Sequence, residues 1–166
     1  MGLNTLHPRL LPLLRLLDHR QFRSGEAIAA QLGISRAGVH GLVRQAEAFG
    51  VVVQAVRGRG YRLAAPLDLL DEARLASALA PLGLHCLCLG EVDSSNARLL
   101  HLSEAGAPHG SLLAAEWQTQ GRGRRGRTWQ AVLGDSLTFS LLWRFTRPVG
   151  ALSGLSLAVG VAMRRA

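Results

Sequence analysis

The sequence predicts an α+β protein in two parts, and three observations lead to that fold class. Leucines recur at helical spacing in a basic N-terminal part, which a short hairpin closes before Pro66. Apolar runs with strand and helix character alternate after that residue. A hydrophobic fraction of 48% over 166 residues argues against a disordered chain. We expect one domain over residues 1–65, a linker over residues 66–70 and a second domain over residues 71–166.

Three helices are expected in the N-terminal part. An apolar stripe at i, i+3, i+4 and i+7 covers residues 10–17 and predicts the first. Ser24 caps a second helix over residues 25–32, and Ser35 caps a third that ends at Gly50. Because a short glycine-containing turn joins the second helix to the third, this pair has the helix-turn-helix signature.

A basic hairpin is expected after the third helix, with strands over residues 51–56 and 61–63. In this position a hairpin is the wing of a winged helix, and nine arginines against three acidic residues before residue 67 indicate a polyanionic partner. The second helix of such a pair lies in the DNA major groove. A solvated charged face and a protein-interaction module remain alternatives. The candidate DNA-binding residues are Ser35 and Arg36 at base edges, His40 and Arg44 at phosphates, and Arg57 and Arg59 on the wing.

Helices and strands alternate in the expected second part, which indicates an α/β or α+β layer. Asp71 caps a short first helix, and the turn Asp93-Ser94-Ser95-Asn96 has the cap chemistry for another. Small residues in the last helix predict close packing on a sheet. The expected elements are helices over residues 72–80, 96–103 and 149–165, and strands over residues 84–89, 111–117 and 136–145.

The loop Gly121–Arg127 holds three glycines and four arginines directly after an expected strand. One guanidinium group can bind two oxygens of a phosphate or carboxylate at once, and glycines let the backbone approach a ligand. We therefore expect an anion-binding site in this loop. Gly121, Gly123 and Gly126 have dinucleotide-binding spacing, but the residues after them do not open a helix. No Gly-Lys-Ser/Thr supports a Walker loop either. A solvated loop that binds RNA or DNA nonspecifically remains an alternative.

Two motifs together resemble the biotin–protein ligases, the family that includes the biotin operon repressors. The first is Asp93-Ser94-Ser95-Asn96, where the family has Asp-Ser-Thr-Asn at the start of a helix. The second is Gln118 followed by Gly121–Trp129, which matches Gln-x-x-Gly-Arg-Gly-Arg-x-Gly-Arg-x-Trp at each fixed position. Ser35-Arg36-Ala37 and Gly58-Arg59-Gly60-Tyr61 resemble the repressor domain of the bifunctional members. The resemblance implies a winged helix-turn-helix followed by the first part of a class II synthetase-like α/β ligase domain.

The resemblance also implies a reaction and the residues that would carry it out. Biotin–protein ligases activate biotin with Mg-ATP to biotinyl-5′-AMP and transfer biotin to a lysine of the biotin carboxyl carrier protein. In the repressors, biotinyl-5′-AMP is also the corepressor, and its binding orders the loop, promotes a homodimer and favours operator DNA. Carried over by position, Ser94, Ser95, Asn96, Gln118, Gly121 and Arg122 would bind biotin, Arg124 would be catalytic at the biotin carboxylate and the phosphate, and Arg125, Arg127 and Trp129 would bind the nucleotide.

The chain departs from this family at its active site, because it contains no lysine and the family's active site uses one. Ligases also continue beyond the matched part. We therefore expect the first half of a ligase, impaired in catalysis. A non-catalytic DNA-binding regulator that senses biotin or biotinyl-AMP is the alternative.

Cysteine usage and hydropathy limit the remaining possibilities. Cys86 and Cys88 alternate on one face of an expected strand, where they are poorly placed to bridge each other, and they have no partner at metal-ligand spacing. We therefore expect them to be small buried hydrophobic residues, and we expect no metal site. Neither a signal-peptide pattern nor an apolar run of membrane-spanning length is present. These features predict a cytoplasmic chain without a membrane partner.

Overall fold

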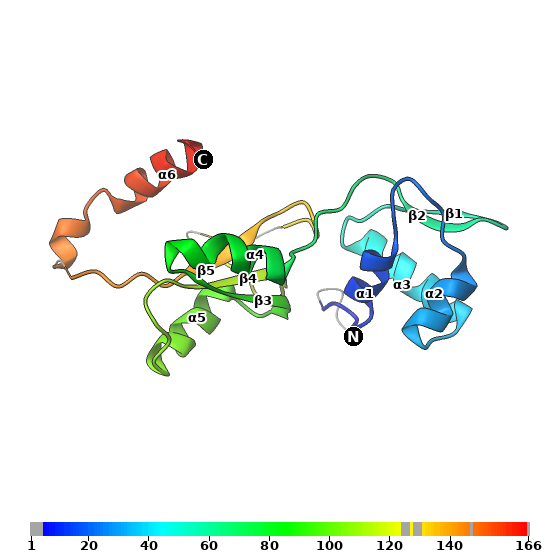
Figure 1. The fold of residues 1–166 in the computed structure, drawn as a ribbon, viewed down its shortest axis with the longest axis horizontal. Helices are drawn as coiled ribbons and strands as arrows, with labels where there is room; N and C mark the ends of the chain where they lie inside the picture. Colours follow the sequence, from blue (N-terminus) through cyan, green and yellow to red (C-terminus); the bar gives the residue numbers. More distant parts are fainter. Residues whose placement is uncertain (1–4, 124–126, 128–130, 147, 166) are drawn as a thin grey trace.

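The computed structural model describes residues 5–123, 127, 131–146 and 148–165. Figure 1 shows a helical N-terminal part beside a part that contains a three-stranded sheet, with an extended connection between them. Helices and a mixed sheet confirm the α+β fold class.

The N-terminal part holds the three predicted helices. Ser24 Oγ accepts a hydrogen bond from the backbone N–H of Ala27, and Ser35 Oγ accepts one from that of Gly38, both at 3.1 Å. These bonds satisfy helix N–H groups that have no partner inside the helix. The helices are α1 (Leu10–Leu16), α2 (Gly25–Leu32) and α3 (Arg36–Ala48).

The end of α3 explains why the next strand starts later than expected. Gly50 N–H donates to Glu47 C=O and Val51 N–H donates to Ala46 C=O, both at 3.0 Å, which is the Schellman pattern of helix termination. The Val51 N–H is thus used to close the helix and does not pair in a sheet. The Val51 side chain is 5% exposed and belongs to the core. The strand β1 consequently covers Val53–Val56, not residues 51–56.

The predicted wing is a hairpin of β1 and β2 (Gly60–Leu63), paired antiparallel. Arg23 and Tyr61 exchange backbone hydrogen bonds of 2.8 and 2.9 Å, which fasten the wing to the segment before α2. This contact requires glycine at the base of the wing. Gly60 has φ +102°, and a Cβ there would lie 2.0 Å from the carbonyl oxygen of Arg23.

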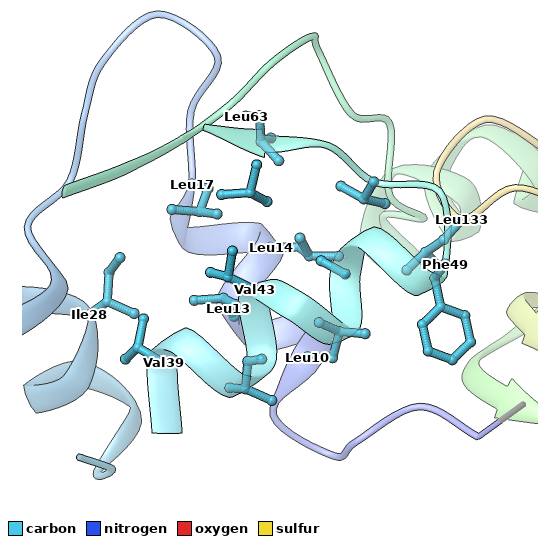
Figure 2. Close-up of a cluster of buried hydrophobic side chains, with 14 of the residues drawn as sticks. Leu10, Leu13, Leu14, Leu17, Ile28, Val39, Val43, Phe49, Leu63 and Leu133 are labelled. Atoms are coloured by element: carbon cyan, nitrogen blue, oxygen red, sulfur yellow. The ribbon is translucent and has the colours of Figure 1, made fainter. Parts of the chain in front are cut away.

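One apolar core holds the N-terminal part together, and a residue distant in sequence belongs to it. Leu10, Leu13 and Val39 pack there with exposures of 0%. Leu133 comes from the segment after the loop Gly121–Arg127, hereafter the arginine–glycine loop. It is also 0% exposed in this cluster and lies beside Phe49 in Figure 2. The N-terminal core is therefore completed by a side chain from the second part.

A mixed sheet forms the centre of the second part. Its strand order is β3-β4-β5, with β3 parallel to β4 and β5 antiparallel to β4. Because β3 and β4 are parallel, their carboxyl ends meet at one edge of the sheet. The strands are β3 (His85–Val92), β4 (Ser111–Gln118) and β5 (Thr138–Leu141).

Two helices lie on opposite sides of this sheet in Figure 1. Asp71 Oδ1 accepts from Arg74 N–H at 3.0 Å and so caps α4 (Glu72–Leu79), as predicted, and a 3-10 turn over Ala80–Leu82 follows. On the other side, α5 (Ser95–Glu104) contributes Leu99 to a small core with Leu113 of β4.

The predicted strand over residues 136–145 is shorter in the structure. Leu141 of β5 pairs with Leu112, and the partner strand β4 begins only one residue earlier, at Ser111. Beyond Leu142, therefore, no further partner residue extends the ladder. The chain instead donates from Arg144 N–H to His109 Nδ1 at 3.1 Å.

The predicted last helix is wrong in both its length and its packing. Gly154 has φ +90°, which divides the segment into a 3-10 turn over Val149–Leu152 and α6 (Leu155–Arg165). The apolar side chains of α6 do not pack on the sheet, because Leu157 is 75% exposed and Met163 is 64% exposed. Figure 1 shows α6 apart from β3, β4 and β5. Apolar spacing alone did not determine its place.

Within the described residues, no helix is both long enough and apolar enough to cross a bilayer.

Candidate functional site

The candidate site lies where the carboxyl ends of β3 and β4 meet. Val92 pairs with Gln118 at the last rung of the parallel ladder. Backbone bonds then hold the two outgoing loops together, from Thr119 N–H to Val92 C=O at 2.9 Å and from Gln120 N–H to Asp93 C=O at 2.8 Å. The two motifs that the sequence analysis singled out are thus adjacent in space.

Four predicted biotin-binding residues gather at this edge. Ser94 is the N-cap of α5, with its Oγ 3.4 Å from Ala97 N. Ser95 opens the helix and is 4% exposed, whereas Asn96 is exposed on the first turn. Gln118 reaches this turn from β4, because its Oε1 accepts from the Ser95 N–H at 2.7 Å.

That last bond fixes the orientation of the Gln118 amide. A backbone N–H can only donate, so the atom of Gln118 that faces Ser95 must be the amide oxygen. The NH₂ group is then the part of the side chain directed elsewhere, and it carries two donors. A half-buried amide held in this way suits a ligand carbonyl at the edge of the sheet.

The arginine–glycine loop begins directly beside these side chains. Gly121 is buried and Arg122 is exposed. Gly123 N–H donates to Arg127 C=O at 2.7 Å, so these two residues lie next to each other, and the Arg127 side chain is exposed. The loop therefore has two exposed arginine side chains among its described residues. The predicted roles of Arg124, Arg125 and Trp129 fall outside the described residues.

Ser140 contacts the candidate site, although sequence reasoning did not single it out. Its Oγ lies 2.9 Å from Ser95 Oγ, across from β5 to the first turn of α5. The only sequence signal was a serine inside an expected strand, and serine at such a position has no specific meaning without the partner. The antiparallel pairing of β4 with β5 is what brings it to the site.

The candidate DNA-binding residues lie on one basic face of the N-terminal part. Arg36, His40 and Arg44 are exposed along α3, and Arg57 and Arg59 are exposed on the wing. Three of these residues, Arg36, Arg57 and Arg59, line a groove of about 600 Å³ between the start of α3 and the wing.

Two arginines of that face have contacts within the protein. Arg36 Nη1 lies 3.4 Å from Glu26 Oε1, and both side chains are at least 75% exposed, so the pair is weak and can open toward another anion. The Arg59 guanidinium lies 4.4 Å from the centre of the Phe22 ring. Ser35 is occupied as the cap of α3. The structure brings the candidate cations to one face without placing nucleic acid on it.

Comparisons with known proteins match both parts of the chain. Residues 9–62 match the model of the HTH domain, and residues 89–166 match that of the biotin/lipoate A/B protein ligase family. The chain combines an HTH domain with a segment of a biotin/lipoate protein ligase. The relationship inferred from the two motifs is thereby confirmed.

Relatives with both activities in their names cover nearly all of this chain. It is 38% identical over 154 residues to the bifunctional ligase/repressor BirA of Salmonella typhimurium, which is 92% of this chain and 47% of the relative. It is 35% identical over 163 residues to the protein of that name from Bacillus subtilis, 96% of this chain and 50% of the relative. A biotin--[acetyl-CoA-carboxylase] ligase of Mycobacterium tuberculosis is 42% identical over 99 residues, 57% of this chain and 37% of the relative. The chain spans about half the length of its bifunctional relatives.

The ligase segment is packed directly against the HTH domain. Val132 approaches the end of α3, since a Cβ on Gly50 would lie 3.1 Å from Val132 Cγ1. Leu133 fills the HTH core beside it, and Trp117 packs against the same cluster. Both flanks of the arginine–glycine loop therefore contact the HTH core. The first follows β4, whose Trp117 packs against the core, and the second places Leu133 inside it.

A buried carboxyl group lies beneath the same interface. Glu116 is 5% exposed in its side chain, and its Oε1 accepts from Leu70 N–H at 2.6 Å and lies 3.5 Å from Arg15 Nη2. Burial raises the pKa of Glu116, and the Leu70 N–H and the Arg15 charge oppose that rise. The Glu116 carboxyl group of the ligase segment therefore contacts both Arg15 of the HTH domain and Leu70 of the linker.

The cysteines and the acidic residues form no metal centre in the part of the chain that the structure describes, where no group of three or more potential ligands occurs. Cys86 and Cys88 are free cysteines with their Sγ atoms 3.6 Å apart on one face of β3, and both are half-buried, so the full burial expected from the sequence is not found.

Proposed function

We propose that this chain is the DNA-binding and biotin-binding part of an ATP-dependent biotin–protein ligase that also represses transcription. The observation that carries the proposal is the contact of Gln118 Oε1 with Ser95 N–H, which joins the two ligase motifs in one site at the end of parallel strands. Ligands of α/β sheets bind at such carboxyl ends.

The biotin-binding roles proposed here follow the chemistry of each group. The ureido ring of biotin offers one carbonyl acceptor and two N–H donors. Gln118 would donate to the carbonyl through its amide NH₂, and the hydroxyl groups of Ser94 and Ser95 can donate or accept. Asn96 would contact the ring or its neighbouring atoms. Gly121 would let the backbone come close to the ring, with Arg122 beside it.

The nucleotide roles rest on charge. Formation of biotinyl-5′-AMP brings a carboxylate against a phosphate, so fixed cations are needed where negative charge accumulates. Arg124 is proposed to face both anions as the catalytic arginine. Arg125 and Arg127 are proposed to bind the nucleotide or steady the loop, and Trp129 to stack on adenine. Mg²⁺ would accompany ATP as its counter-ion.

The HTH domain is proposed to bind operator DNA, and biotinyl-5′-AMP to act as corepressor. Arg36 would contact base edges, and His40, Arg44, Arg57 and Arg59 would contact phosphates or the minor groove. Ser35 would hold the start of α3 in place. A homodimer would match a two-fold symmetric operator. The carrier-protein partner, the division at residues 66–70 and the cytoplasmic location stay predictions.

Biotin-dependent exchange of pyrophosphate into ATP tests the ligase half of the proposal. A folded chain that supports biotin-dependent exchange, reduced in Gln118→Ala, is the expected result. A folded chain without exchange, whose DNA affinity still responds to biotin or biotinyl-AMP, would favour the non-catalytic regulator. Circular dichroism recorded on the same samples establishes that each variant is folded.

The DNA half has its own test. Arg36→Ala should lower the preference for operator over random duplex, because a base-edge contact is worth about 1–3 kcal/mol of discrimination. Arg57→Ala should weaken both duplexes alike and reduce the salt dependence of binding. Arg74→Ala removes an exposed arginine of α4 and serves as the matched control. If the arginine–glycine loop instead binds nucleic acid nonspecifically, Arg127→Ala should lower the affinity for nucleic acid and Arg36→Ala should not.

A further inference from the structure

The side chains of β5 have an unusual arrangement, with polar residues on the face that packs against α5 and apolar residues on the other face. Leu113 of β4 packs with Leu99 of α5, and its antiparallel partner on β5 is Ser140. Residues directly opposite in an antiparallel pair point to the same face, so Ser140 faces α5. The outward positions Phe139 and Leu141 are 39% and 41% exposed. The strand therefore turns polar side chains inward and apolar ones outward.

A hydroxyl group on an inward face costs free energy unless it has a hydrogen-bond partner. Ser140 has its partner in Ser95, with 2.9 Å between the two Oγ atoms. Ser95 is 4% exposed, so its hydroxyl is largely shielded from solvent. The pair is thus a specific contact between β5 and the first turn of α5.

Ser95 is consequently held at two atoms from two strands. Its N–H donates to Gln118 on β4, and its hydroxyl bonds to Ser140 on β5. A hydroxyl can donate one hydrogen bond and also accept. When Ser95 donates to Ser140, its own oxygen is left to accept from a ligand N–H. When Ser140 donates, the Ser95 proton is left for a ligand carbonyl.

We infer that Ser140 is a positioning residue of the biotin site, which acts by orienting the Ser95 hydroxyl toward the ureido ring. The inference rests on the proposed function, because it assigns a role within that binding site. It predicts that loss of the Ser140 hydroxyl weakens biotin binding and leaves ATP binding as it is, since the hydrogen bond of the Ser140 side chain among the described residues goes to Ser95 and not to the arginine–glycine loop.

Equilibrium dialysis on the full chain, with labelled biotin and separately with ATP, tests this assignment. Ser140→Ala should weaken biotin binding about tenfold, the scale of one lost hydrogen bond. Ser140→Thr keeps the hydroxyl and should restore most of the affinity. Ser111→Ala is the matched control, because its hydroxyl donates to Pro108 C=O at the opposite end of the sheet. It should leave biotin binding unchanged.

Two results would overturn the inference while the wild-type chain binds biotin. One is equal biotin affinity in wild type and Ser140→Ala. The other is a parallel loss for biotin and ATP with a lower unfolding temperature, which indicates a structural role alone. A wild-type chain that binds no biotin would instead remove the proposed function, and the inference with it.

A second measurement needs no ligand. Hydrogen exchange of the Ser95 amide reports on its bond to Gln118. Ser140→Ala should speed that exchange, and Ser111→Ala should not. Unchanged exchange in Ser140→Ala would show that Ser140 does not position Ser95.

Discussion

The ring of Phe49 lies edge-on to the ring of Trp117, with 4.8 Å between their centroids and 89° between their planes. Phe49 is the C-cap of α3, the helix proposed to enter DNA, and Trp117 directly precedes Gln118 of the biotin site. Such a pair is worth about 0.5–1.5 kcal/mol beyond its buried area. One aromatic contact therefore links the candidate ligand site to the candidate DNA-binding helix.

Leu133→Ala is expected to destabilise the HTH domain although the residue lies in the ligase segment. Its side chain is fully buried in the HTH core, and a buried Leu→Ala change costs about 2–5 kcal/mol. Urea unfolding followed by circular dichroism measures the loss. Leu137→Ala, at a position 67% exposed, should change stability by less than about 0.5 kcal/mol. Equal stabilities of the two variants would show that Leu133 is not part of that core.

Gly60→Ala should disrupt the wing and weaken DNA binding. An added Cβ would lie 2.0 Å from Arg23 C=O, which is backbone and cannot move aside without breaking the contact with Tyr61. Gly58→Ala is the matched change at the tip of the wing, where φ is +77° and no atom lies within 4 Å of the new Cβ. That variant carries only backbone strain, about 1 kcal/mol. DNA affinity that falls equally in both variants would argue against the Arg23 contact as the cause.

Glu116→Gln should change how stability depends on pH. Burial raises the pKa of Glu116 above its ordinary value of 4.5, so its stabilising contribution is present below that value and is lost as pH rises through the raised pKa. Gln cannot ionise but still offers an oxygen to Leu70 N–H. The variant should therefore gain stability relative to wild type as the pH rises above the ordinary pKa of 4.5 and through the raised pKa of Glu116. Glu104→Gln, whose side chain is 81% exposed, should show no such trend in the urea midpoint.

Cys88 should react slowly with alkylating reagents in the folded chain. Burial, followed by the neighbouring Cys86, raises the pKa of Cys88 from 9.0 to about 12. The reactive thiolate fraction near pH 8 then falls about 1000-fold. Iodoacetamide labelling of the Cys88 peptide, read by mass spectrometry, should accelerate sharply in urea. A labelling rate that is the same in folded and unfolded chains would contradict this expectation.

Local chemistry made much of the HTH domain predictable from sequence. Ser24 and Ser35 each precede a helix and each cap it, because a serine oxygen satisfies N–H groups in any first turn. The glycines of the wing turn marked the hairpin for a similar reason. Such signals depend on a few neighbouring residues and need no knowledge of the fold.

Contacts between distant residues could not be predicted in this way. Leu133 looks like a loop residue, and only its packing into the core of the HTH domain gives it a core role. Ser140 needed the register of β5 against β4 to reach Ser95. The wrong prediction for α6 has the same origin, because apolar residues at helical spacing do not indicate which surface the helix packs against. The biotin motifs were found from sequence, whereas their mutual geometry was not.

Calorimetric titration of the chain with biotin tests the proposed biotin site, where Gln118 meets Ser95. We predict saturable binding of one biotin per chain, weakened at least about tenfold in Gln118→Ala. Gln31→Ala, at an exposed position on α2, should bind as wild type does. Absence of saturable binding by the folded wild-type chain, or equal affinity in Gln118→Ala, would show that biotin does not bind where Gln118 meets Ser95.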